Sequence, residues 1–281
     1  MEIPKNVVPG YESWRPEAFE KKDGIWIGPR AAVSYPEAGH EIWPESLDNW
    51  WYAHRAQIVL ESAERYRRGP RAIWDIGGGT GLMSAAFREQ GWATVVVEPI
   101  EAAARLAVSK ADIVFAGVLE DLEVPPGSVP ALGLFDVIEH LDDPTVVLRH
   151  CQRILAPGGI VLVTVPAIPF LWSATDRAAG HKRRYTKAQM RTEAAAVGLR
   201  AAELRYFFAL PALAALPLRL VGDSRRQQDA DEAILRREAR LLTPPPRVDG
   251  LLHAVLRIER SIGRHIAFPI GLSLMAVLVH E

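Results

Sequence analysis

The sequence predicts an α/β fold, in which a mostly parallel sheet carries helices on both faces. The first observation is a glycine-rich turn at residues 75–81 (DIGGGTG), which stands between an apolar run and a helix-like segment. The second is that short apolar runs alternate with helix-like segments over residues 72–166. Such alternation is typical of parallel strands joined by crossover helices.

The elements can be assigned in chain order. A first helix is expected at 47–68, because Trp51, Ile58 and Tyr66 recur at helical spacing. Five strands are then expected at 72–76, 93–98, 112–116, 131–136 and 159–166, with helices at 82–90, 100–108 and 144–155. A sixth strand at 199–206 and a seventh at 271–280 complete the predicted sheet.

The glycine turn and the end of the next strand indicate a nucleoside ligand. Glycine lets the backbone approach a ligand closely because no Cβ intervenes. A dinucleotide fingerprint would need a third glycine at position 82, where Leu82 stands, and no Walker A lysine is present. Glu98 ends the second strand, where a carboxylate can accept both hydroxyls of a ribose. The pattern therefore favours a nucleoside without phosphates.

Four motifs together resemble those of class I S-adenosylmethionine-dependent methyltransferases of the small-molecule type. They are residues 75–81, Val97-Glu98-Pro99, residues 135–144 (FDVIEHLDDP) and residues 155–159 (LAPGG). The resemblance covers residues 46–208 and returns near the C-terminus. It implies a Rossmann-like, seven-stranded mixed sheet and S-adenosyl-L-methionine as the cofactor.

The resemblance also implies a cofactor site at the carboxyl ends of the strands. There Glu98 would bind the ribose and Asp136 would lie beside the methyl sulfonium. Arg55 would bind the carboxylate of the cofactor, since a guanidinium can do so in bidentate fashion; the alternative is an exposed helix charge. The full implied set is Asp75, Gly77, Gly79, Gly81, Glu98, Val118, Leu119, Asp136 and Arg55.

Two histidines are candidates for catalysis. Methyl transfer is an in-line displacement that mainly needs positioning, and a general base helps when the acceptor atom carries a proton. His140 follows the fourth strand, where a helix-start hydrogen bond is the alternative role. His181 lies in the loop after the fifth strand, and Thr186 with Gln189 predicts a capping box that anchors this loop.

The same loop offers candidates for substrate binding. Arg183, Arg184 and Tyr185 are expected to face the cleft, where the two arginines could hold a carboxylate or phosphate of the substrate. The alternative is a solvated basic turn.

A D-x-x-E-H cluster, formed by Asp136, Glu139 and His140, has oxygen ligands of the kind that Mg²⁺ prefers. As a metal site the cluster looks incomplete. The sequence therefore predicts that no metal is bound.

Residues 1–46 are predicted to form an N-terminal extension. This stretch is rich in Pro, Gly and Trp, and residues 25–27 and 32–35 could pair as a hairpin around Gly28-Pro29. A packed extension is favoured over a lid that closes over the cofactor. Residues 47–207 would then form the cofactor-binding core.

Residues 208–268 are predicted to be a helical insertion between the last two strands, with 269–281 returning to the core sheet. Apolar residues recur on one face of its last helix, at Leu251, Val255, Ile258 and Ile262. The expected roles, in order of preference, are a hydrophobic substrate pocket, a homodimer surface and a peripheral membrane contact.

Composition narrows the classes of function. The chain has 281 residues, of which 49% are hydrophobic and 24% charged, which suits a soluble globular enzyme. The net charge of −1 argues against a nucleic-acid partner. Cys151 is the sole cysteine, so neither an internal disulfide nor a cysteine-based metal site is expected. No signal-peptide pattern is visible, and a cytoplasmic location is expected.

The sequence thus predicts an S-adenosylmethionine-dependent methyltransferase acting on an O or N atom of a small molecule with an anionic or hydrophobic part. One alternative is an enzyme that uses the same cofactor for non-methyl chemistry, such as a cyclisation. Another is a non-catalytic partner subunit, which the intact glycine turn and Glu98 disfavour.

Overall fold

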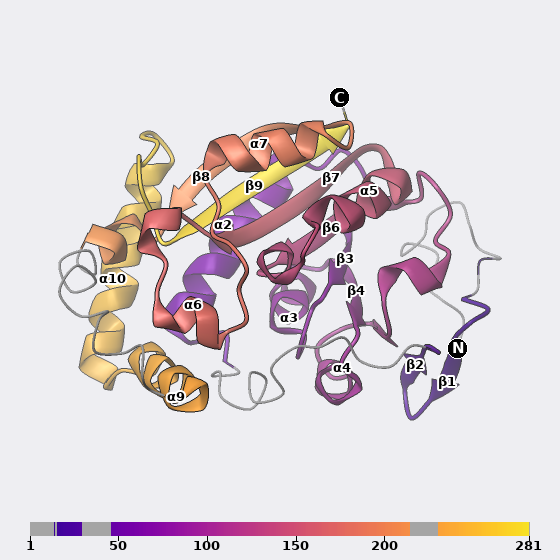
Figure 1. The fold of residues 1–281 in the computed structure, drawn as a ribbon, viewed down its shortest axis with the longest axis horizontal. Coiled ribbons are helices and arrows are strands. Elements are labelled where there is room, and N and C mark those ends of the chain that lie inside the picture. Colours follow the sequence, from indigo (N-terminus) through magenta and orange to yellow (C-terminus); the bar gives the residue numbers. More distant parts are fainter. Residues whose placement is uncertain (1–13, 15, 30–45, 214–229, 281) are drawn as a thin grey trace.

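A computed structural model describes residues 14, 16–29, 46–213 and 230–280 (Figure 1). These residues form one nine-stranded sheet with the strand order β1-β2-β5-β4-β3-β6-β7-β9-β8, and helices cover both of its faces. The predicted α/β, Rossmann-like fold is confirmed. The sheet is wider than the predicted seven strands because an N-terminal hairpin extends one edge.

The centre of the sheet is parallel. Its strands are β3 (Ala72–Ile76), β4 (Ala93–Glu98), β5 (Ile113–Ala116), β6 (Val129–Phe135) and β7 (Leu155–Pro166). At the far edge, β9 (Ser273–His280) runs antiparallel between β7 and β8 (Leu199–Phe207). The carboxyl ends of β3, β4, β5 and β6 therefore lie at the same edge of the sheet.

Two layers of helices bury the sheet. The core helices are α2 (Trp50–Tyr66), α3 (Leu82–Glu89), α4 (Glu101–Ala107), α5 (Pro144–Ile154), α6 (Ala174–Ala178) and α7 (Lys187–Ala195). Apolar residues of α5 and α7 share a buried cluster with one face of the strands, and those of α2 and α3 share another with the opposite face. The predicted capping box of Thr186 and Gln189 is confirmed at the start of α7.

The N-terminal hairpin differs from the prediction. Residues Ile25–Ile27 do form a strand, β2, but its antiparallel partner is β1 (Glu20–Lys22), while residues 32–35 lie outside the described residues. The turn is Asp23-Gly24, both with positive φ, which is the strongest short hairpin signal in a sequence. β2 pairs with β5 in parallel, and Phe19 is buried against Phe115, with their ring centroids 5.6 Å apart. The β2–β5 pairing makes the hairpin part of the sheet, and the Phe19–Phe115 contact packs it against the core.

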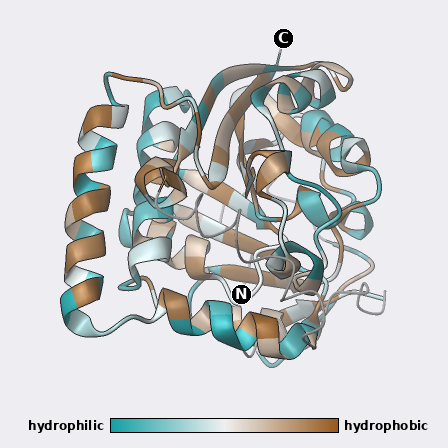
Figure 2. Cartoon of the chain, turned by 60° about the vertical axis from the view of Figure 1, so that its left-hand side comes forward, coloured by the Kyte–Doolittle hydropathy of each residue, from teal (hydrophilic) through white to brown (hydrophobic). Residues whose placement is uncertain are grey.

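Two helices, α9 (Asp231–Leu242) and α10 (Pro246–Gly263), make up the described part of the predicted insertion together with residues 208–213. Ile234 and Leu235 of α9 pack against α6. Leu256 of α10 joins the cluster around α2, and Glu259 accepts a hydrogen bond from the N–H of Leu210 at 2.9 Å. Figure 2 brings this side of the molecule forward and shows hydrophobic segments on its helices. Among the described residues, no helix is long and apolar enough to cross a membrane.

Candidate active site

A cavity of about 1040 Å³ opens at the carboxyl ends of the parallel strands. The ends of β3, β4 and β6 contribute the glycine turn, Glu98 and Asp136, respectively. The insertion adds an apolar wall with Leu241 and Leu242 of α9. Ligands of open α/β sheets bind at this edge, and most of the predicted site residues line this cavity.

Gly77, Gly78 and Gly79 of the glycine turn line the cavity, whereas Gly81 does not and lies beside Ala107. Gly77, Gly79 and Gly81 have φ values of +68°, +54° and +81°, a region that side chains with a Cβ rarely adopt. Among the described residues other than its chain neighbours, none has an atom within 4 Å of a Cβ built on Gly79, which lines the cavity. The space in front of Gly79 is therefore open to a ligand.

Two buried carboxylates flank this turn. Glu98 accepts hydrogen bonds from the N–H groups of Gly79 and Ile100, each at 2.8 Å. Burial raises the pKa of Glu98 to about 7, against the effect of these bonds. Each of its oxygens retains a lone pair for a ribose hydroxyl.

Asp75 accepts a hydrogen bond from Ser84 Oγ at 2.9 Å through Oδ2. Its Oδ1 is buried without a hydrogen-bond partner among the described residues, and burial raises the pKa of Asp75 to about 6. An unpaired acceptor here suits the amino group of the predicted cofactor. Glu98 thus offers acceptors for the predicted ribose, and Asp75 adds a second buried acceptor beside the glycine turn.

Arg55 and Asp136 form an ion pair on the cavity wall. Arg55 is buried on α2, so it is not an exposed helix charge. Thr164 Oγ1 donates a hydrogen bond to Asp136 Oδ1 at 3.1 Å, which holds the second oxygen of that carboxylate. The Nε of Arg55 has no hydrogen-bond partner in the described part of the chain. Asp136 thus does not use every donor of this guanidinium.

Val118 and Leu119 follow β5 and also line the cavity, at the position where the resemblance implies the adenine ring. Neither side chain can hydrogen-bond, so the contact they offer is apolar. Their predicted role stays a prediction.

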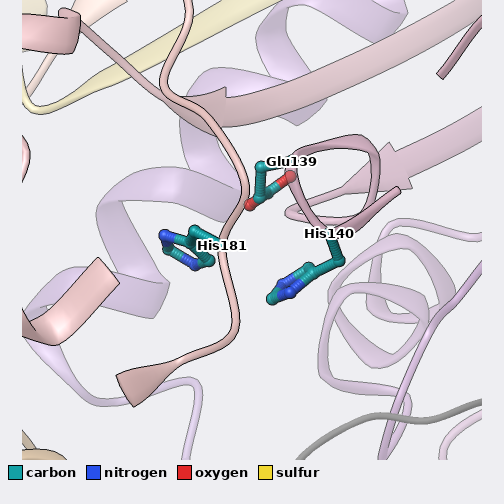
Figure 3. Close-up of side chains that lie close together, drawn as sticks. All are labelled: Glu139, His140 and His181. Carbon is teal, nitrogen blue, oxygen red and sulfur yellow. The ribbon is translucent and has the colours of Figure 1, made fainter. Parts of the chain in front are cut away.

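The two candidate histidines lie side by side (Figure 3). Their ring centroids are 4.9 Å apart, and both side chains line the cavity. The Nδ1 of His140 is 3.3 Å from the carbonyl oxygen of Gly180. Burial, and then the neighbouring His181, lower the pKa of His140 to about 4.

His181 is oriented by a carboxylate that the sequence analysis missed. Its Nδ1 is 2.9 Å from Oδ1 of Asp176, and Nε of Arg184 donates to the same oxygen at 2.7 Å. Burial alone would raise the pKa of Asp176, but these two partners outweigh it and lower the pKa to about 2. Asp176 closes a capping box with Ser173 at the start of α6. The S-x-x-D pattern of these residues in the sequence could have placed Asp176 at a helix start.

Glu139 stands beside the two histidines. Its side chain is fully buried, and neither carboxylate oxygen has a hydrogen-bond partner among the described residues. Burial, followed by the negative charge of Asp136, raises the pKa of Glu139 well above its usual range. Asp136 itself faces Arg55, so the predicted D-x-x-E-H trio is divided between two clusters.

The three predicted substrate residues do not all face the cavity. Arg183 donates to the carbonyl oxygens of Leu141 and Asp142, at 2.9 and 2.7 Å, and the Tyr185 side chain is buried in the core. Arg184 lines the cavity, but its guanidinium bonds to Asp176 and, at 3.1 Å, to the carbonyl oxygen of Ala167. Because these donors serve protein acceptors, the geometry gives no support to an anionic substrate group held by this loop.

Comparison with known proteins agrees with this geometry. A family model of a methyltransferase domain matches residues 56–216. The ubiquinone biosynthesis O-methyltransferase of Pseudomonas aeruginosa is 30% identical over 110 residues, which are 36% of this chain and 47% of that protein. The chain thus spans about half the length of the curated relatives it matches.

Solved structures share the fold at low identity. A chain from the complex between the Haloferax volcanii Trm112 methyltransferase activator and a methyltransferase has a TM-score of 0.55 at 17% identity, over 89% of this chain and 99% of that one. Phosphoethanolamine N-methyltransferase 2 of Haemonchus contortus, solved with S-adenosyl-L-methionine, has a TM-score of 0.52 at 18% identity, over 80% of this chain and 52% of that one.

Proposed function

Since the chain belongs to the class I S-adenosylmethionine-dependent methyltransferase family, we propose that it methylates an oxygen or nitrogen atom of a small molecule. One observation carries the proposal: the open glycine turn and its two carboxylates share a cavity with the histidine pair. S-adenosylmethionine supplies, when bound, a methyl group that is already activated. What the protein adds is mainly the alignment of two reactants.

We propose that the cofactor end of the cavity uses the residues that the sequence singled out. Glu98 accepts the ribose hydroxyls, and Asp75 accepts the amino group through Oδ1, which has no partner among the described residues. Arg55 binds the carboxylate through the donor that Asp136 does not use. Val118 and Leu119 contact the adenine ring.

The other end of the cavity is proposed to hold the acceptor. Its wall is apolar: Trp51 stacks on Phe208 with ring centroids 3.9 Å apart, and Leu241 and Leu242 lie on α9. A substrate with a hydrophobic part fits this wall. An oxygen acceptor is favoured, because the curated relatives are described as O-methyltransferases. His181 and His140 assist the loss of the acceptor's proton, either as a base or through a cation that they hold.

Calorimetric titration with S-adenosylmethionine and S-adenosylhomocysteine tests the cofactor assignment, with NADH as the control. Micromolar binding of both sulfur nucleosides, and none of NADH, is expected. Failure of both to bind contradicts the proposal. A screen of hydrophobic phenols by product mass then tests the reaction. Substrate conversion without a gained methyl group would favour non-methyl chemistry.

A further inference from the structure

We propose that Glu139, His140 and His181 bind one divalent first-row metal ion, for which zinc is the best match. One ligand atom from each side chain lies within 4.8 Å of the others, and the three side chains converge from two segments (Figure 3). Ligand atoms stand ~2.0–2.2 Å from a zinc ion and therefore up to about 4 Å from each other. Small side-chain rotations are enough to close the site around an ion.

The hydrogen bonds of the two imidazoles favour metal binding. A carbonyl oxygen only accepts, so the 3.3 Å contact with Gly180 places the proton of neutral His140 on Nδ1. The carboxylate of Asp176 does the same for His181. In each ring Nε2 then carries the lone pair. Metal-binding histidines commonly donate their other N–H to a carboxylate or a backbone carbonyl in this way.

Glu139 provides an independent observation. Its side chain has no solvent exposure, and both carboxylate oxygens lack a hydrogen-bond partner in the part of the chain that the structure describes. The neighbouring charges are already paired, Asp136 with Arg55 and Asp176 with Arg184. A buried carboxyl group is either neutral or paired with a cation. A cation beside the histidines would supply the partner that Glu139 lacks.

The backbone holds the two segments together before any ion binds. The N–H of Lys182 donates to the carbonyl oxygen of Glu139 at 2.8 Å and so joins the two segments. Within the second segment, the N–H of His181 donates to the carbonyl oxygen of Asp176 at 2.8 Å. Arg183 adds its bonds to the carbonyl oxygens of Leu141 and Asp142. Because these bonds already fix the two segments, metal binding costs less conformational entropy.

The donor set determines which metal fits. Two nitrogens and one carboxylate resemble catalytic zinc sites with three protein ligands and one open position, whereas Mg²⁺ prefers oxygen ligands. All three residues line the cavity and the two imidazoles are partly exposed, so the open position faces it. Resting on the proposed function, we infer that this position takes the acceptor's hydroxyl oxygen. A coordinated hydroxyl releases its proton to water at lower pH than a free one.

Cobalt titration of the full chain tests the site, after a chelator has removed bound metal. One Co²⁺ per chain should bind with visible d–d absorption. Zn²⁺ should displace the bound cobalt, and Mg²⁺ should not. Glu139→Gln, which keeps the shape of the side chain, should weaken binding at least 10-fold, as should His181→Ala. Asp176→Asn should weaken it about 10–100-fold through the orientation of His181. His265→Ala, an exposed histidine outside the cluster, is the matched control and should bind normally.

Absence of stoichiometric cobalt, or equal affinity in Glu139→Gln and wild type, overturns the metal site. Titration of the metal-free protein with S-adenosylhomocysteine separates this result from the proposed function, because no proposed ligand is a proposed cofactor residue. Nucleoside binding without cobalt binding contradicts the metal site alone. Cobalt binding without nucleoside binding contradicts the proposed function alone. Circular dichroism of each variant shows whether it is folded.

Discussion

Arg55 on α2 and Asp136 at the end of β6 stand 81 positions apart in the chain and form an ion pair on the cavity wall. The pair links the first core helix to the edge of the sheet where the ligand is proposed to bind. Because Arg55 is buried and Asp136 is partly exposed, the pair lies between the exposed and the fully buried classes of ion pair.

Arg55→Met should lower the free energy of unfolding by about 1–3 kcal/mol. Exposed pairs contribute ~0–1 kcal/mol, and breaking a buried pair costs ~3–5 kcal/mol. The variant should also bind S-adenosylhomocysteine at least about 10-fold more weakly, since a hydrogen bond to a charged group contributes ~1.5–3 kcal/mol. Arg105→Met, which breaks the exposed pair with Glu101, is the control for denaturant unfolding. Unchanged nucleoside affinity in Arg55→Met would remove Arg55 from the site.

Gly79→Ala and Gly91→Ala form a matched pair. Both glycines have positive φ, and a Cβ on either would have no atom within 4 Å from the described residues beyond its chain neighbours. Each variant should therefore lose ~1–2 kcal/mol of stability through backbone strain. Only Gly79 lines the cavity, so only Gly79→Ala should weaken S-adenosylhomocysteine binding, by about 10-fold or more. Equal affinity of the two variants would show that the ligand does not approach the turn.

Glu98→Gln should weaken S-adenosylhomocysteine binding by about 2–4 kcal/mol. The variant keeps the shape of the side chain but replaces a charged acceptor, and each such hydrogen bond contributes ~1.5–3 kcal/mol. Glu101→Gln, three residues further on and exposed, should bind normally in the same calorimetric assay. Normal binding by Glu98→Gln would mean that this carboxylate does not hold the ribose.

The ligand-free protein should lose stability as pH rises through the titration of two buried acids, Glu98 and Asp75. The folded pKa of Glu98 is about 7 and that of Asp75 about 6, above their ordinary values of 4.5 and 3.8. At pH values between the ordinary and the raised pKa of each group, the folded state binds more protons than the unfolded state. The free energy of unfolding therefore falls as pH increases.

Urea unfolding at pH 5 and pH 8 measures this effect. For Glu98 it amounts to about 3 kcal/mol, at ~1.36 kcal/mol per pKa unit. Between pH 5 and pH 8, the free energy of unfolding of Glu98→Gln should fall by about 3 kcal/mol less than that of the wild type. An identical fall in both proteins would contradict the raised pKa.

Phe19→Ala should lower the free energy of unfolding by ~3–5 kcal/mol, the usual cost of removing a buried phenylalanine. The ring of Phe19 occupies the space in front of Gly28 and Gly117, where an added Cβ would lie 2.8 Å from it. Phe170→Ala, with a residue that is 72% exposed, should change stability by less than about 0.5 kcal/mol. If the extension were a mobile lid, Phe19→Ala would instead alter nucleoside affinity and leave stability almost unchanged.

Local patterns in the sequence were sufficient for the core of the fold. The turn from Gly77 to Gly81 and the acid at Glu98 are each read from a few consecutive residues, and parallel strands bring their carboxyl ends to one edge. The strand at Ile25–Ile27 was also recognised, but its partner was not. The Asp23-Gly24 turn was the overlooked signal.

The sequence alone thus determined the α/β sheet, the glycine turn and the place of Glu98 at the end of the next strand. Strand periodicity, glycine geometry and strand order are local or follow from chain order. Tertiary structure alone decided which polar groups meet. Asp176 reaches His181, and Arg184 turns to Asp176 rather than to the substrate. Glu139 lies beside two histidines, with no hydrogen-bond partner among the residues that the structure describes. Such contacts depend on where loops from β6 and β7 fold in space. The direction of a long side chain in a loop follows from the acceptors around it, which the residue order does not specify.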